Sequence, residues 1–164
     1  MNARDALKTA LAGSQHTLNW YLEDLSDADL LVRPAPTANH IAWQLGHLVE
    51  AEGHLLGDQL PGVSYPSLPA GWSDQHSKKT ASMDPPKGFA TKAEYLRLLK
   101  QMRDATIAAV AKLSDADLDR PTTGSMAQFA PTLGALVVLT SNHTLMHAGQ
   151  FTVVRRKLGK PVLF

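Results

Sequence analysis

Apolar residues recur every three or four positions along four long stretches of the chain, a spacing that is typical of helices with one buried face. The pattern predicts helices over about 4–25, 39–56, 92–113 and 131–157. No segment alternates apolar and polar residues for long enough to predict a sheet. The expected fold class is therefore all-α, with four long helices.

Residues with special backbone preferences lie where these helices are expected to begin. Thr37 or Asn39 is placed to cap the second helix, because a short polar side chain can accept a hydrogen bond from a free backbone N–H group. Thr91, with Glu94 three residues later, predicts a capping box at the start of the third helix. Pro131 suits the first turn of the fourth helix, since an N–H group there would have no helical partner.

A long loop is expected between the second and third helices, from Gly57 to Ala90, where the chain has five prolines and four glycines. A loop of this length in a compact domain usually has a function or is disordered. Trp72 argues against disorder, because a large aromatic side chain needs a packing partner. We expect a crossover that lets the second and third helices run parallel, with the segment around Trp72 forming part of a substrate-binding wall.

The chain contains an internal repeat at an offset of 88 residues. Leu-Ser-Asp-Ala-Asp-Leu occurs at 25–30 and at 113–118, and Leu-Gly-His-Leu-Val at 45–49 returns as Leu-Gly-Ala-Leu-Val at 133–137. Both matches fall at junctions between predicted helices, which indicates a duplicated helical hairpin. Two hairpins joined by the crossover predict a four-helix bundle with approximate two-fold symmetry. The serine and acidic residues of the first match predict capped helical turns.

Length and composition favour one domain, 1–164, without disulfide bonds, because a chain of this size can enclose its own core. The absence of cysteine excludes thiolate metal sites and fits a reducing cytoplasm. Sixteen basic and fifteen acidic side chains give a formal net charge of +1, so no nucleic-acid partner is expected. The charged N-terminus lacks the apolar run of a signal peptide.

The fourth predicted helix is unusual because the stretch from Pro121 to Val154 contains no Asp, Glu, Lys or Arg. Residues 133–154 approach the length of a membrane-spanning helix. Asn142, Gln150 and two histidines would be poorly placed against lipid, and no second such stretch occurs, so we expect no membrane association. A helix without charge on any side is instead expected to be covered by its own bundle and by a partner subunit, which predicts a homodimer.

Three histidines are the candidate metal ligands. His143 and His147 are four residues apart in the fourth predicted helix, so both imidazoles project from one face and can reach the same ion. His47 lies far upstream in the second predicted helix. Neutral imidazoles bind zinc, nickel, copper and iron, and three of them leave a coordination position open. Helical histidines are more often buried or exposed without a ligand role, so the spacing alone leaves both interpretations open.

The remaining histidines are weaker candidates. His54 and Glu50 together could belong to a site with a carboxylate. His16 lies in the first predicted helix, His40 lies just before the second, and His76 lies in the loop. A ferritin-like di-metal centre needs glutamates on facing helices, and the fourth predicted helix has no acidic residue before Val154. We therefore expect a mononuclear site.

Two motifs contain the candidate ligands: Ile-Ala-Trp-Gln-Leu-Gly-His-Leu at 41–48 and His-x-x-x-His-Ala-Gly-Gln at 143–150. Together they resemble the DinB superfamily, the DNA-damage-inducible four-helix proteins that are also similar to bacillithiol and mycothiol transferases. The resemblance spans nearly the whole chain. It implies an up-down-down-up four-helix bundle, frequent dimers, and a divalent metal ion on His47, His143 and His147. Some relatives add a thiol cofactor to an electrophile or isomerise a substrate with it.

These observations lead to a hypothesis in two parts. The first is a divalent ion on the three histidines, zinc or nickel in preference to iron or manganese, with Trp43 and Gln150 beside the ligands. Core packing and a buried amide are the alternative roles of these two residues. The second part is a transferase in which the ion activates a low-molecular-weight thiol for attack on a small electrophile, with Glu50 as a candidate base. A metal-dependent hydrolase and a non-catalytic stress-response module with a structural metal remain open as alternatives.

Overall fold

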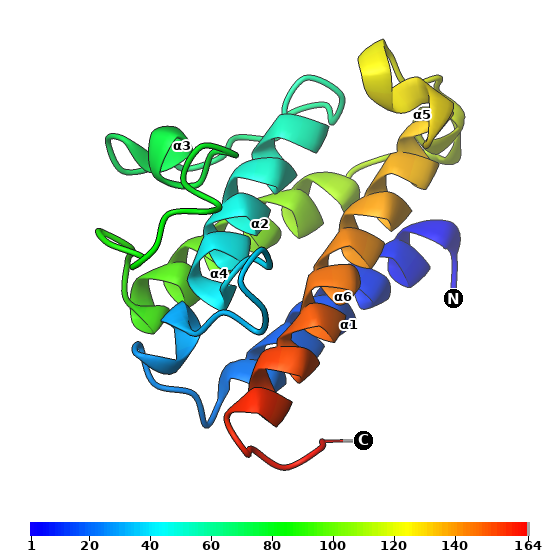
Figure 1. Ribbon diagram of the computed structural model, residues 1–164. Coiled ribbons are helices and arrows are strands. Elements are labelled where there is room, and N and C mark those ends of the chain that lie inside the picture. The colour runs from blue at the N-terminus through cyan, green and yellow to red at the C-terminus, as the bar shows by residue number, and fades with distance from the viewer. Residues whose placement is uncertain (164) are drawn as a thin grey trace.

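The protein is a four-helix bundle in the computed structural model, which describes residues 1–163. The long helices are α1 (Ala3–Leu22), α2 (Ile41–Leu56), α4 (Lys92–Val110) and α6 (Leu133–Lys157). Short helices occur in the connections: η1 (Asp29–Leu31), α3 (Trp72–Gln75), α5 (Asp115–Asp119) and η2 (Gly124–Gln128). Figure 1 shows no strand among these residues, which confirms the all-α prediction.

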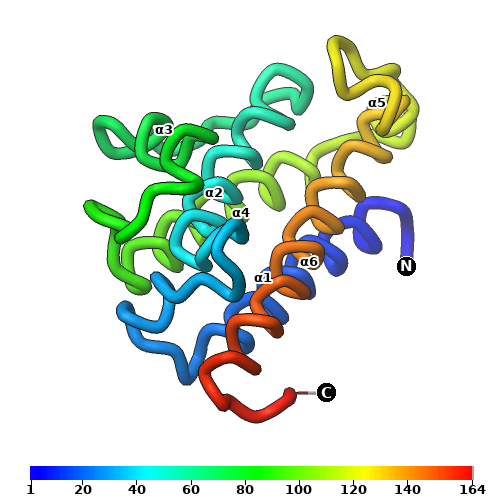
Figure 2. The backbone as a smooth tube through the Cα atoms, in the orientation of Figure 1, coloured from blue at the N-terminus to red at the C-terminus, as the bar shows by residue number. Residues whose placement is uncertain are grey.

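The four long helices follow an up-down-down-up topology, as the two apolar clusters at the ends of the bundle show. One cluster joins the last turns of α1 and α6 to the first turns of α2 and α4: Leu22, Val154, Ile41 and Tyr95. The other joins the opposite ends of the same helices: Leu7, Leu136, Leu56 and Val110. Helices α1 and α6 are therefore parallel, and α2 and α4 run in the opposite direction, as Figure 2 shows.

The two copies of Leu-Ser-Asp-Ala-Asp-Leu fold into the same turn. Ser26 and Asp29 exchange two hydrogen bonds, one from each backbone N–H to the other side chain, at 2.8 and 3.2 Å. Ser114 and Asp117 make the same two bonds at 2.8 and 3.2 Å. The capped turns predicted from the sequence are confirmed, and their shared pair of hydrogen bonds supports a duplicated hairpin, although the first turn continues as a 3-10 helix and the second as an α-helix.

All three predicted helix starts differ in detail from the structure. His40, not Thr37 or Asn39, caps α2: its Nδ1 atom accepts a hydrogen bond from the backbone N–H of Trp43 at 3.1 Å. Thr91 caps α4 as predicted, but the Glu94 carboxylate binds a neighbouring arginine and does not return to the cap, so only half of the capping box forms. An imidazole can cap because its unprotonated nitrogen accepts as a serine oxygen does.

Helix α6 begins two residues later than expected. Thr132 is its cap and accepts a hydrogen bond from the backbone N–H of Ala135 at 3.2 Å, while Pro131 precedes the helix instead of lying in its first turn. The Thr132 hydroxyl accepts from a backbone N–H group that has no partner within the helix. Proline as the cap has no hydroxyl and would leave this N–H group unpaired.

The crossover loop between α2 and α4 packs against the bundle through Trp72 and His76. The Trp72 indole N–H donates to the backbone oxygen of Gly46 at 3.1 Å. His76, which is 3% exposed, donates from Nδ1 to the Trp72 carbonyl and accepts at Nε2 from the Tyr95 hydroxyl, both at 2.9 Å. Packing of Trp72 is thus confirmed, and His76, which lies in the loop as expected, is buried with it.

A buried ion pair connects all four long helices. Arg103 on α4 and Glu52 on α2 are each 3% exposed, with 2.9 Å between Nε and Oε1. The guanidinium also donates to the Leu11 carbonyl and the Ser14 hydroxyl on α1, at 2.6 and 2.8 Å, and to the Thr144 hydroxyl on α6, at 2.9 Å. This network fixes the position of α6 against the other helices at the level of its histidines.

Within residues 1–163, no helix combines the length and the apolar character that crossing a bilayer would require.

Candidate metal centre

The three predicted ligands meet between α2 and α6, which are neighbours in the bundle. Each of His47, His143 and His147 offers one ring nitrogen, and the three nitrogens lie within 4.8 Å of one another. The Nε2 atoms of His143 and His147 are 3.1 Å apart, close to the roughly 3.3 Å expected between two imidazole nitrogens on a tetrahedral zinc ion. The chain therefore brings together a donor set that fits a divalent ion.

Burial keeps the three rings neutral, which is the form that binds a metal. Desolvation lowers the pKa of each of His47, His143 and His147. The effect is largest at His147, which is 8% exposed and whose pKa falls to about 3 because of burial and its two histidine neighbours. Removing a proton before an ion binds therefore costs little at neutral pH.

The tautomer of His147 is set by Gln44, a residue that the sequence did not identify as part of the site. The Gln44 side-chain N–H donates to the backbone oxygen of Asn39 at 3.0 Å. Its amide oxygen therefore faces His147 and accepts from Nδ1–H at 2.8 Å. Because Nδ1 carries the proton, the lone pair of His147 lies on Nε2, the nitrogen that faces His143.

Gln150, the amide expected beside the ligands, is exposed, so its alternative role as a buried amide is wrong; it lines a separate pocket together with Gln44. Gln44 instead lies three residues before His47, in the otherwise apolar run 41–46 at the start of α2, and is 1% exposed. A buried amide one turn from a candidate ligand is a signal that the sequence contained.

Trp43 supports the ring of His47. The two rings are stacked, with 5.3 Å between their centroids and 7° between their planes. The indole N–H donates to the backbone oxygen of Ser77 at 3.0 Å, which fixes Trp43 in turn. Trp43 is thus a buried packing residue, which confirms one of its two predicted roles, and it also contacts the ring of a candidate ligand.

A cavity of about 280 Å³ borders the histidine cluster. His47 and His143 form one side of it, and the rest of the wall comes from α2, α6 and η2: Ala51, His54, Leu55, Met126, Leu139 and Met146. These residues are apolar except for the imidazole of His54. A molecule in the cavity can therefore reach the ligand rings while most of its surface contacts thioether and aliphatic side chains.

Two residues expected near the reaction centre do not line this cavity. Trp72 is 6% exposed and packs in the core, so the crossover loop does not supply the predicted substrate wall there. Glu50 is half-buried on α2 and is absent from the wall, so the structure gives no support for its role as a base.

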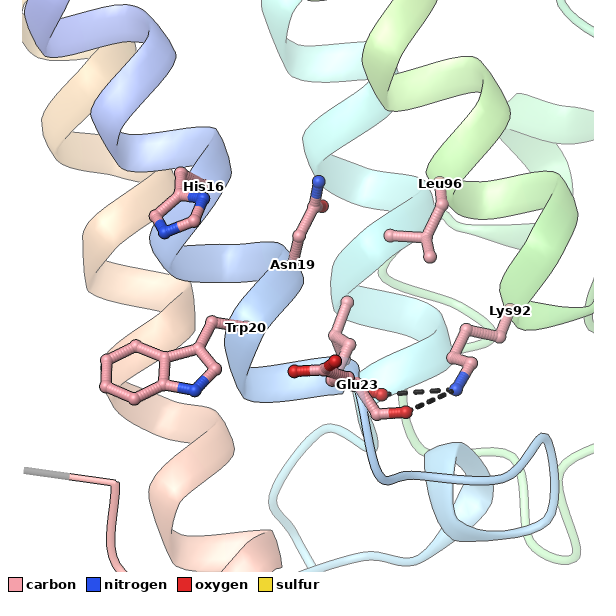
Figure 3. Close-up of a pocket in the computed structure, with 7 residues that line it drawn as sticks. His16, Asn19, Trp20, Glu23, Lys92 and Leu96 are labelled. Atoms are coloured by element: carbon pink, nitrogen blue, oxygen red, sulfur yellow. Dashed lines mark hydrogen bonds between the residues drawn. The ribbon is translucent and has the colours of Figure 1, made fainter.

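The other histidines remain outside the three-nitrogen cluster. His40 caps α2, His76 is bound to Tyr95, and His54 lies on the cavity wall. His16 lies on α1 beside a larger groove of about 680 Å³ between α1 and α4, on the side of the bundle opposite α2 and α6 (Figure 3).

The lysine at the end of this groove, Lys92, is already bound to the backbone. The Lys92 ammonium group donates to the carbonyl oxygens of Leu22 and Glu23, both at 3.2 Å, at the end of α1 (Figure 3). A cation is favourable there because the last carbonyls of a helix carry partial negative charge. The groove's lysine thus serves the fold.

Two solved structures share the fold. A conserved protein from Enterococcus faecalis has 17% sequence identity and a TM-score of 0.72, with 98% of this chain and 99% of that chain covered. YfiT from Bacillus subtilis, described as a probable metal-dependent hydrolase with an unusual four-helix bundle topology, has 17% identity and a TM-score of 0.69, with 96% and 89% covered. A comparison with curated proteins finds no match.

The family is shown by the sequence itself, because the family model of the DinB superfamily matches residues 10–151. This match includes both helices that carry the candidate ligands. With its four-helix bundle and its cluster of three histidines, the chain belongs to the DinB superfamily.

Proposed function

We propose that the protein is a metal-dependent enzyme in which His47, His143 and His147 hold a divalent ion beside a small-molecule substrate. The observation that carries the proposal is the convergence of three neutral imidazole nitrogens next to a cavity. An ion bound there would lower the pKa of a water or thiol nucleophile and polarise the bond under attack. Zinc and nickel suit three imidazoles best, with iron and manganese as alternatives.

The surrounding side chains prepare the ligands for binding. Gln44 keeps the proton of His147 on Nδ1, and Trp43 holds the plane of the His47 ring. The network of Arg103 ties α6 to the bundle through Thr144, which lies between the two histidines of that helix. A ligand set that is already ordered loses little conformational freedom when an ion binds.

Hydrolysis of a small molecule is the reaction we propose first. The cavity wall has no lysine or arginine that would bind an anionic cofactor, and water needs no such site. YfiT, which shares the fold, is described as a probable metal-dependent hydrolase. Thiol-dependent transfer to an electrophile is the second candidate, supported by the neutral ligand set, which leaves the full charge of the ion to stabilise a thiolate.

The test is turnover by protein loaded separately with zinc and with nickel, against small esters, amides and electrophiles, with and without added thiol. Metal-dependent cleavage without thiol would support the hydrolase, and a strict requirement for thiol would support the transferase. His47→Ala and His143→Ala are expected to lose both metal and turnover. An ion bound with no open coordination position, and no turnover in either assay, would contradict an enzymatic role and favour a structural metal.

We also propose that the protein forms a homodimer through the outer face of α6. Val138, Leu145 and Val153 on this helix are 43%, 42% and 52% exposed, and an apolar face of this kind is costly in water. Sedimentation velocity is expected to give a dimer for the wild type and a shift toward monomer for Leu145→Lys. A wild-type monomer at micromolar concentration would contradict the proposal.

A further inference from the structure

The helical spacing of the wall residues places apolar side chains directly around the candidate ligands. On α6, Leu139 lies one turn before His143 and Met146 lies one turn after it. On α2, Ala51 and Leu55 lie one and two turns after His47. Met126 of η2 closes the wall from the connection that precedes α6.

The charges in and around the cavity are distributed unevenly. Three neutral imidazoles leave a bound divalent ion with its full positive charge, so one anionic or strongly polar group is attracted to the ion. The rest of the wall has no carboxylate, ammonium or guanidinium group to pair with a second charge. A further charged group on the substrate would lose hydration and find only the imidazole of His54 as a polar partner on this wall.

We propose that this cavity selects substrates with a single metal-binding polar group attached to an uncharged, apolar body. This inference rests on the proposed function, because the polar group is placed by the metal ion. The volume of about 280 Å³ limits the enclosed part to a group about as large as a substituted phenyl ring or a short acyl chain. The two thioethers, Met126 and Met146, can adapt to different apolar shapes.

The test uses two hydroxamic acids, which bind a divalent ion through the same pair of oxygens. Benzohydroxamic acid has an uncharged phenyl body, and its 4-carboxy analogue differs by one carboxylate. Calorimetric titration of the zinc-loaded protein at pH 8 is expected to give a dissociation constant at least about tenfold lower for the uncharged compound. Equal affinities, or tighter binding of the carboxylate, would overturn the inference.

A charge placed on the cavity wall should change this preference. Met146 is 60% exposed, so Met146→Lys can fold, and its ammonium group at the cavity is expected to reduce or reverse the preference for the uncharged compound. Ala108→Lys places the same charge on the exposed face of α4, outside this cavity, and is expected to keep the wild-type preference. If both variants changed the preference to the same extent, the uncharged cavity wall would not be the cause of the preference.

Zinc content, measured before each titration, distinguishes failure of the substrate selection from failure of the metal site. If the wild type retains one zinc ion per chain but binds both hydroxamic acids equally well, the selection for apolar substrates is wrong and the metal site stands. If the wild type takes up no zinc or nickel, the proposed function fails and this inference fails with it.

Discussion

At the scale of single residues, the amide of Gln44 has one orientation that satisfies both of its neighbours. The backbone oxygen of Asn39 can only accept a hydrogen bond, so the amide nitrogen faces it and the amide oxygen faces His147. The orientation of one side chain thus determines which nitrogen of a ligand is free for a metal ion. Sequence spacing predicts that the histidines share one site. It does not show that the tautomer of His147 depends, through Gln44, on the backbone carbonyl of Asn39.

Replacing Gln44 should therefore weaken metal binding without removing a ligand. Gln44→Leu leaves Nδ1–H of His147 without an acceptor, and loss of such a supporting bond typically lowers metal affinity by about 10- to 100-fold. The affinity can be measured by competition for zinc with a chromophoric chelator. Gln150→Leu is the matched control, because Gln150 is exposed, and it should bind zinc as the wild type does. Equal zinc affinity in both variants would show that Gln44 does not position His147.

His40 should make the stability of the metal-free protein depend on pH. Burial, followed by the nearby charges of Arg33 and His76, lowers its pKa from 6.5 to about 4. The unfolded chain takes up a proton below about pH 6.5, whereas folded His40 does so only near pH 4, so stability falls as the pH is lowered between these values. The loss is about 3 kcal/mol at most from this residue.

Urea unfolding at pH 7 and at pH 4.5 measures this loss. Asparagine can still cap α2 but does not titrate, so His40→Asn is expected to lose less stability between the two pH values than the wild type. An identical loss in both proteins would rule out His40 as a source of the pH dependence.

At the scale of secondary-structure elements, the crossover loop is attached to α2 at the residue next to a candidate ligand. The ring of His76 packs directly on Gly46, where an added Cβ atom would lie 2.0 Å from the ring. Sequence periodicity predicts the long helices because their apolar stripes repeat, and it predicts the crossover from its prolines and glycines. It cannot predict that His76 is buried, because loop residues have no repeating pattern from which to infer a face.

The substitution Gly46→Ala should therefore loosen the loop. Either the His76 ring or α2 must move, and overpacking of this kind costs about 1–3 kcal/mol. The melting temperature should fall, and limited proteolysis should cut faster within residues 57–90. At Gly13, in the middle of α1, an added Cβ atom meets nothing within 4 Å, so Gly13→Ala should slightly raise the melting temperature. A melting temperature for Gly46→Ala that matches or exceeds the wild-type value would contradict this packing.

At the scale of the whole molecule, the bundle combines an apolar core at each end with a buried ion pair between them. Arg103 and Glu52 join α4 to α2, and the remaining guanidinium hydrogen bonds reach α1 and α6. The internal repeat of 88 residues predicts the two hairpins, and shifting α1 by this offset gives residues 91–110, nearly the bounds of α4. The pairing of Arg103 with Glu52 depends on how the hairpins dock, which their separate patterns do not specify.

Removing one charge of this pair should destabilise the whole bundle. Glu52→Gln leaves a buried guanidinium without its anion, which typically costs about 3–5 kcal/mol of unfolding free energy. Asp104→Asn removes a carboxylate from an exposed pair with Lys100 and should cost less than about 1 kcal/mol. Urea unfolding of both variants gives the comparison, and equal losses would mean that the buried pair does not hold the helices together.

The proposed site requires three imidazoles, from two neighbouring helices, to bind one ion. Anomalous diffraction at the absorption edges of zinc and nickel, from crystals of protein purified without a histidine tag, shows whether they do. We expect one divalent ion per chain, in contact with nitrogens of His47, His143 and His147. An ion bound elsewhere, or no ion at these nitrogens after the protein has been equilibrated with zinc and nickel, would contradict it.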